Sequence, residues 1–234
     1  MSQTKAQLLN PLGELSSSDV TVNSVSIGKG ANSVTGNIVL GTSALDASVS
    51  GGNNTALGHS TLSTLTSGSF NTAVGSESMI LLTTGSQNVG VGYETLQSLT
   101  TADGNTAIGV RALQANTTGA NNTAIGVQAL YANTTADANT GVGQNALVNN
   151  TTGASNTAVG RLAMDANTTG NNNAAFGSNA LGANTTGELN AAFGVSCLDA
   201  NTTASNNSAF GSHALGANTT GTFNTAVGSL ALDA

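Results

Sequence analysis

Short apolar stretches alternate with runs of Asn, Thr, Ser and Gly along the chain, and the alternation has a strict period of 17 residues. Each period opens with Asn, two mostly small residues, an aliphatic residue or Phe, and Gly. We number the repeat positions 1 to 17 from this Asn. Position 1 is occupied by Asn37, Asn54, Asn71, Asn88, Asn105, Asn122, Asn139, Asn156, Asn173, Asn190, Asn207 and Asn224. Twelve copies without an insertion indicate a repeat architecture.

Four further columns of the repeat keep one residue type. Position 5 is always Gly, position 4 carries a core-type residue, and position 8 is small. Position 9 is Leu or Met in every copy: Leu45, Leu62, Met79, Leu96, Leu113, Leu130, Leu147, Met164, Leu181, Leu198, Leu215 and Leu232. The single cysteine, Cys197, falls at position 8, so we interpret it as a small packed residue and not as a reactive thiol.

A period of 17 residues is too short for a helical-pair repeat and suits one coil of a β-solenoid. The sequence therefore predicts an all-β fold, a β-solenoid (β-roll) of twelve 17-residue coils. Thr106 to Gly109 reads as a strand ended by a turn. Its alternation predicts that position 4 (Ile108, Ile125) and position 9 (Leu130) point inward, and that position 3 (Ala124) points outward, where it permits close packing between chains.

Two glycine columns have different predicted roles. Gly at position 5 in all copies indicates either a positive φ or a backbone approach that excludes a Cβ. Position 15 holds Gly119, Gly153 and Gly170 but also accepts Ala, so small size matters there more than φ.

Stacked coils place equivalent residues about 4.8 Å apart, which predicts a ladder of hydrogen-bonded amides along the Asn of position 1. A second Asn column at position 12 predicts another ladder. This column comprises Asn116, Asn133, Asn150, Asn167, Asn184, Asn201 and Asn218. Earlier coils carry Leu65, Leu82 and Leu99 at the same position.

Composition removes several classes of function. Charged residues make up 6% of the chain, four residues are basic, and the net charge is −7, so no basic surface for nucleic acid is expected. Two histidines and one cysteine make neither a metal site nor a nucleophile–base pair. We expect no catalytic, cofactor-binding or metal-binding residue, no cofactor and no enzymatic activity. Arg111 and Arg161 are expected at solvated outward corners.

The chain divides into two parts. Residues 37–234 form the predicted shaft of 17-residue repeats, and residues 1–36 are interpreted as an N-terminal attachment segment with an atypical first coil, whose strand lies near residues 24–28. The first 18 residues contain no long apolar run, so neither a signal peptide nor membrane insertion is expected.

The repeat Asn-Thr-Ala-Val-Gly-x-x-Ala-Leu-x-Ala-Asn-Thr-Thr-Gly is similar to repeats of phage tail-fibre-like proteins. Asn23-Ser-Val-Ser-Ile-Gly28 resembles the head repeat of trimeric autotransporter adhesins, and Lys5-Ala-Gln-Leu-Leu-Asn-Pro11 resembles the start of marine-phage fibre proteins. These resemblances cover residues 23–234 and the N-terminus, and they imply a left-handed coil packed as a parallel homotrimer. The membrane anchor of the adhesins and the chaperone domain of many fibres have no counterpart in the sequence.

These patterns support three functional hypotheses. The first is a structural virion fibre or spike subunit that gives rigid reach and host-surface attachment. Its partners would be copies of itself in a homotrimer, other virion proteins through residues 1–36, and a host-surface receptor. The low apolar content of each coil also favours self-association. The second is an ice-binding solenoid that uses the Thr column at position 13, such as Thr117 and Thr151. The third is a bacterial surface adhesin head.

Overall fold

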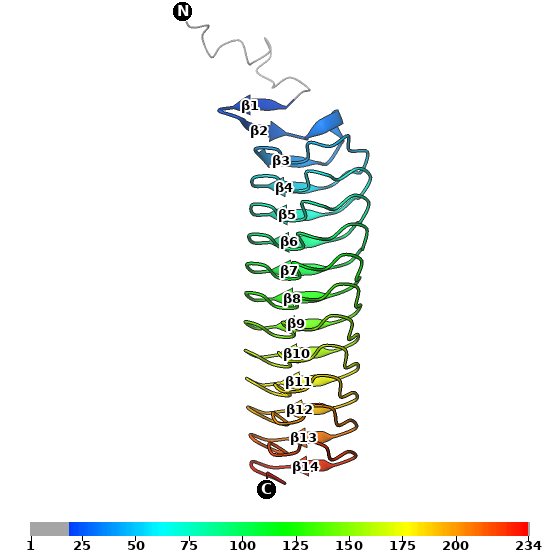
Figure 1. Cartoon of the computed structure of the whole chain (residues 1–234). Helices are drawn as coiled ribbons and strands as arrows, with labels where there is room; N and C mark the ends of the chain where they lie inside the picture. Colours follow the sequence, from blue (N-terminus) through cyan, green and yellow to red (C-terminus); the bar gives the residue numbers. More distant parts are fainter. Residues whose placement is uncertain (1–18, 234) are drawn as a thin grey trace, which may run out of the picture.

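The computed structural model describes residues 19–233 and shows an all-β solenoid (Figure 1). Fourteen strands form one sheet in the order of the sequence. The strands are β1 (Val20–Val22), β2 (Val25–Gly28), β3 (Ile38–Gly41), β4 (Thr55–Leu57), β5 (Thr72–Val74), β6 (Val89–Val91), β7 (Thr106–Ile108), β8 (Thr123–Ile125), β9 (Thr140–Val142), β10 (Thr157–Val159), β11 (Ala174–Phe176), β12 (Ala191–Phe193), β13 (Ser208–Phe210) and β14 (Thr225–Val227). The predicted β-solenoid with a 17-residue coil is confirmed, with about 11 turns.

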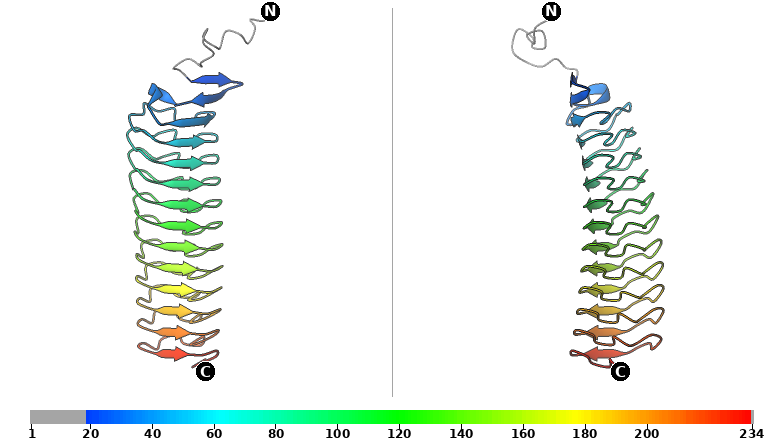
Figure 2. Two further views of the ribbon diagram at one scale, coloured as in Figure 1. Left: turned by 180° about the vertical axis from the view of Figure 1, so that it is seen from behind. Right: turned by 60° about the vertical axis from the view of Figure 1, so that its left-hand side comes forward.

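Strands β3 to β14 are parallel, and each contributes positions 2 to 4 of one repeat. Equivalent residues pair across neighbouring strands, as Thr106 does with Thr123 and Ile108 with Ile125. The backbone ladder continues into the strand ends, where the amide of Thr106 donates to the carbonyl of Asn122 at 2.8 Å. Each coil is therefore bonded to the next in register, and identical residues lie in rows along the shaft (Figure 2).

The predicted direction of the strand side chains is wrong at two of three positions. Leu130 is fully buried, as expected, but Ala124 is also fully buried and Ile125 is 39% exposed. Position 3 therefore faces the interior, and positions 2 and 4 face outward. The same inversion holds for Ile108, which is also exposed.

The narrow interior of the coil explains the inversion. From β4 to β14 the strand packs directly on positions 8 and 9 of the turns, and position 3 holds only Ala or Gly, whereas β3 at the N-terminal end of the shaft carries the buried Val39. At Gly90 of β6, an added Cβ would lie 2.6 Å from Ser78 Oγ and 2.9 Å from Met79 Cε. A β-branched or aromatic side chain at position 3 would overfill this space, whereas the long Leu at position 9 spans it.

Positions 7, 9 and 17 of the repeat adopt the left-handed conformation and carry a non-glycine residue in all copies except at Gly104, a feature not predicted from the sequence. In one coil these are Arg111 (φ 59°), Leu113 (φ 52°) and Asn121 (φ 58°), at positions 7, 9 and 17. Side chains branched at Cβ are least tolerated in this region. No copy of these three positions carries Val, Ile or Thr, although the chain is rich in Thr. This explains why the interior column is Leu or Met and never Ile.

The two glycine columns differ as predicted. Gly126 at position 5 has φ 135°, and an added Cβ would lie 2.5 Å from the carbonyl oxygen of Gly143 in the next coil. Both predicted causes therefore act at this position. Gly119 at position 15 has no positive φ, and Ala136 occupies the same position one coil later.

The Asn ladder at position 1 is confirmed. The backbone amide of Asn122 donates to Asn105 Oδ1 at 3.0 Å, and Asn122 Nδ2 donates to the same oxygen at 3.2 Å. Asn122 Nδ2 also donates to the carbonyl of Ala136 at 2.8 Å. Each buried Asn thus joins the start of its strand to the previous coil and to the turn that leads into the next coil.

The second ladder at position 12 is also confirmed. Asn133 Nδ2 donates to Asn116 Oδ1 at 3.1 Å and to the carbonyl of Ala136 at 3.0 Å. In the earlier coils, Leu65, Leu82 and Leu99 fill this corner and are fully buried. The first coils therefore have an apolar corner where the later coils have a hydrogen-bonded one.

An antiparallel hairpin covers the N-terminal edge of the parallel sheet. The strand expected near residues 24–28 is present as β2, but it runs antiparallel to both β1 and β3 and is not a further parallel coil. The short helix η2 (Ala31–Ser33) follows, and the Asp19 carboxylate accepts hydrogen bonds from the amides of Lys29 and Gly30 at 2.6 and 2.7 Å. Pairing this edge blocks strand addition there. Residues 1–18, with the resemblance at Lys5 to Pro11, lie outside the described residues.

Substitutions in β8 should distinguish the inward position from the outward one. Ala124→Leu overfills the interior and is expected to lower the free energy of unfolding by about 3 kcal/mol or more. Ile125→Thr, on the exposed face of the same chain, should change the stability of the single chain by about 1 kcal/mol or less. Chemical denaturation of both variants checks this, and equal losses would contradict the assignment of the two faces.

Removal of one ladder amide should be costly. Asn139→Ala leaves the buried amide of Asn156 without its acceptor, which costs about 1–3 kcal/mol, and removes one of the two side-chain donors to the carbonyl of Gly153, which keeps Asn150. Asn149→Ala is the matched control, because Asn149 is exposed and donates to one carbonyl at the surface. Thermal unfolding should show a large drop for the first variant only, and similar drops for both would show that the ladder adds little.

Candidate functional site

The outward face of the sheet is the largest regular surface that the structure presents. The strands lie in one row along one side of the shaft, and the turns form the other side (Figure 2). Position 2 contributes Ile38, Thr55, Thr72, Val89, Thr106, Thr123, Thr140, Thr157, Ala174, Ala191, Ser208 and Thr225. Position 4 contributes Leu40, Leu57, Val74, Val91, Ile108, Ile125, Val142, Val159, Phe176, Phe193, Phe210 and Val227. We call these two columns the outer sheet face. It carries no charged residue.

Position 4 of this face is unusually apolar for a surface. Leu57, Ile108 and Ile125 are each 39% exposed, and Leu40 is 42% exposed. Because the column runs the length of the shaft, these side chains form a continuous apolar strip. Strips of this extent on soluble proteins mark interaction surfaces.

Three phenylalanines form a stack within the strip. The rings of Phe176 and Phe193 lie 4.8 Å apart with an interplanar angle of 7°, and those of Phe193 and Phe210 lie 5.0 Å apart with the same angle. The parallel strand register places them one above another in β11, β12 and β13. In this stack the ring faces contact one another, and the ring edges lie at the surface.

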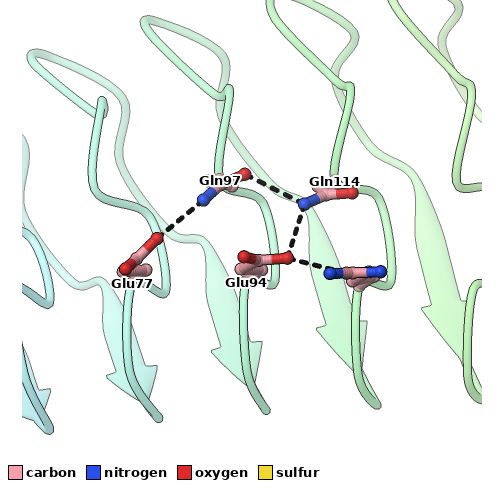
Figure 3. Close-up of polar contacts among 5 residues, drawn as sticks. Glu77, Glu94, Gln97 and Gln114 are labelled. Atoms are coloured by element: carbon pink, nitrogen blue, oxygen red, sulfur yellow. Dashed lines mark hydrogen bonds and ion pairs between the residues drawn. The ribbon is translucent and has the colours of Figure 1, made fainter.

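A polar cluster on the turns that follow β5, β6 and β7 is the second candidate site (Figure 3). We call Glu77, Glu94, Gln97, Arg111 and Gln114 the corner cluster. Glu94 Oε2 accepts hydrogen bonds from Arg111 Nε at 2.7 Å and Gln114 Nε2 at 2.8 Å. Gln97 links the two ends, because it accepts from Gln114 Nε2 at 2.9 Å and donates to Glu77 Oε2 at 2.9 Å.

The electrostatics of the corner cluster favour an ionised Glu94. Hydrogen bonds from Tyr93 and Arg111 lower the pKa of Glu94, and the Glu94 carboxylate raises the pKa of both Tyr93 and Arg111. The Glu94 side chain is 11% exposed and the Arg111 side chain is 44% exposed. The cluster therefore joins three successive coils at one corner, and its chemistry is that of a structural clamp.

Cys197 is buried in the interior, whereas His59 and His213 are exposed on the turns. Cys197 is fully buried, its thiol donates to the carbonyl of Ala209 at 3.2 Å, and burial raises its pKa to about 11. This agrees with its interpretation as a packed residue. His213 Nδ1 lies 2.9 Å from Ser212 Oγ. This contact joins adjacent residues and is exposed. Within residues 19–233, no three His, Cys, Asp or Glu side chains are close enough to hold a metal ion.

Sequence reasoning missed the corner cluster. Arg111 was expected to be solvated, but it is paired with Glu94. The signal was available, since Glu77, Glu94 and Arg111 all occupy position 7 in consecutive copies, where stacking brings them side by side. Gln97 and Gln114, at position 10 of the copies that hold Glu94 and Arg111, complete the pattern.

No family model, no curated protein and no solved structure matches the chain. Within the described residues, no helix has the length and apolar character needed to cross a membrane.

Acid should remove the stabilisation that the corner cluster gives to the folded chain. The folded state lowers the pKa of Glu94, so its stabilising effect is present at neutral pH and is lost as the pH falls through this lowered value, below the ordinary range near 4. The melting temperature of wild type should exceed that of Glu94→Gln at pH 7, and the gap between the two should narrow as the pH is lowered below the ordinary range of a glutamate. Asp46→Asn, at an exposed carboxylate, is the control. A gap between wild type and Glu94→Gln that does not change with pH would contradict the role of the ion pair.

Proposed function

We propose that the chain is a structural fibre or spike subunit of a virion, whose work is rigid reach and attachment to a host surface. One observation carries this proposal: the coils are bonded without interruption by the backbone and by buried Asn ladders. Eleven steps of about 4.8 Å give a shaft roughly 55 Å long. Such a stack resists bending, because any bend strains many ladder hydrogen bonds at once.

The partners in this proposal are further copies of the chain, other virion proteins and a host-surface receptor. Assembly as a parallel homotrimer is supported by the apolar strip of the outer sheet face, which a single chain leaves in water. The buried position of Ala124 and its equivalents removes that column as a packing surface between chains. Attachment to other virion proteins is assigned to residues 1–36. Within this segment, β1, β2 and η2 form the cap on the parallel sheet.

Ice binding is the second candidate, because the Thr columns are regular. The hydroxyl of Thr117 at position 13 donates to the carbonyl of Thr134 at 3.0 Å. In the same way, the hydroxyl of Thr151 donates to the carbonyl of Thr168. Hydroxyl groups bonded within the protein are poorer templates for ordered water. Position 2 also presents Thr outward, but Val89, Ala174, Ala191 and Ser208 interrupt that column. These features favour the fibre over the ice binder, and they leave the adhesin head as a variant of the same architecture.

Two measurements on the full chain test this function. Light scattering at micromolar concentration should give a mass of about three chains, and dilute protein should show neither thermal hysteresis nor faceted ice crystals. A stable folded monomer would contradict the assembled fibre. Ice shaping that Thr151→Tyr abolishes would replace the fibre with the ice-binding function.

A further inference from the structure

Large and small residues are matched across the outer sheet face. Wherever position 4 is aliphatic, position 2 of the same strand is Thr, Val or Ile. In the three strands where position 4 is Phe, position 2 is Ala or Ser instead: Ala174 with Phe176, Ala191 with Phe193, and Ser208 with Phe210. The largest residues of position 4 are therefore always paired with the smallest residues of position 2.

The interior of the same solenoid shows why such matching is informative. Position 8 is enlarged from the usual Ala to Thr61, Ser78 and Thr95 in three consecutive coils, and the strand residue that lies against the last two of them is Gly90 in place of Ala. A Cβ on Gly90 would lie 2.6 Å from Ser78 Oγ and 3.0 Å from Thr95 Oγ1. Volume is conserved there because the space is closed, whereas side chains facing only water have no such constraint.

We infer that the outer sheet face is closed in the working protein by the same face of further copies of this chain, aligned without axial stagger, and that the segment from β11 to β13 sets this alignment. The inference rests on the proposed assembly and names its interface. In a cyclic assembly each contact is between two different patches, so position 4 of one chain meets position 2 of its neighbour. At equal height, each Phe then meets an Ala or Ser.

A copy of the same chain is the occupant that fits best. The face repeats every coil along its length, so only a partner with the same spacing matches it from end to end. Each chain has a net charge of −7, and the outer sheet face carries none of the charged residues, so like-charged chains can approach there. The outer sheet face measures about 55 Å by about 10 Å. Because its side chains project from the sheet, its accessible area is larger than this product and approaches the roughly 800 Å² that each partner buries in a standard interface.

The alignment follows from the position of the aromatic segment. A shift of one coil in one direction would place Phe176 of one chain against Thr157 of a neighbour, and a shift in the opposite direction would place Phe210 against Thr225. The other nine strands of the shaft carry similar residues at positions 2 and 4, so they would tolerate that shift. The three Phe coils are therefore the part of the face that distinguishes the aligned arrangement from its staggered alternatives.

The test compares one substitution on two sides of the shaft. Ala191→Phe fills the small position of β12 on the outer sheet face. Ala183→Phe is the control, because it makes the same change on the turn side, at position 11. Another coil carries the exposed Leu81 at that position. Sedimentation equilibrium of the full chain should show at least tenfold weaker assembly for Ala191→Phe and unchanged assembly for Ala183→Phe. Circular dichroism should show both variants folded.

A double-mutant cycle tests the volume match itself. Ala191→Thr and Phe193→Val should each weaken assembly, and the double variant, which restores the pair found in most coils, should recover most of the loss. If Ala191→Thr lowers only the melting temperature, the match reflects crowding within one strand, and the inference fails while the trimer stands. If all variants assemble like wild type, the interface lies elsewhere. A monomeric wild type would overturn the assembly itself.

Discussion

The buried side-chain amide of the Asn that opens each repeat is the interaction on which the solenoid depends. A coil of 17 residues has little interior, so its polar backbone groups lie close to the core and each needs a partner. Asn meets this need with one side chain, whose Oδ1 accepts from the next coil while Nδ2 donates across the turn. Asp lacks the donor, and Ser lacks both the reach and the second group. The identity of position 1 follows from this double requirement.

The same lack of interior space fixes the other columns. The turns close only by placing three residues of each coil in the left-handed region, and one of them, at position 9, must also fill the core. Leu and Met satisfy both demands, because they are long and unbranched at Cβ. From β4 onward, the strand opposite carries only Ala or Gly inward, as at Ala124 and Gly141. The bulky residues of positions 2 and 4 are displaced to the surface, where they create the apolar strip that the proposed assembly uses.

The sequence alone was enough to predict the period, the strands, both Asn ladders, the glycine roles and the Leu column, because each depends on contacts between equivalent residues in adjacent copies. It was not enough to predict which face of the strand is inward. Alternation separates Ala124 from Ile125 but does not say which one faces the interior, and hydrophobicity pointed to the wrong residue. The deciding quantity is the width of the coil, which the turn conformations set. Likewise, β2 was expected as a strand, but its antiparallel pairing depends on the path of the chain through η2.

Hydrogen exchange of the Asn side-chain amides, followed by NMR, tests the central role of the ladders most directly. The Nδ2 protons of Asn122 and Asn133 are buried and bonded, so they should exchange only when the coils open, orders of magnitude more slowly than those of the exposed Asn149. The slow rates should match those of the strand amides, since both report the same opening. Exchange of the ladder amides as fast as that of Asn149, in a chain whose strand amides stay protected, would contradict this account.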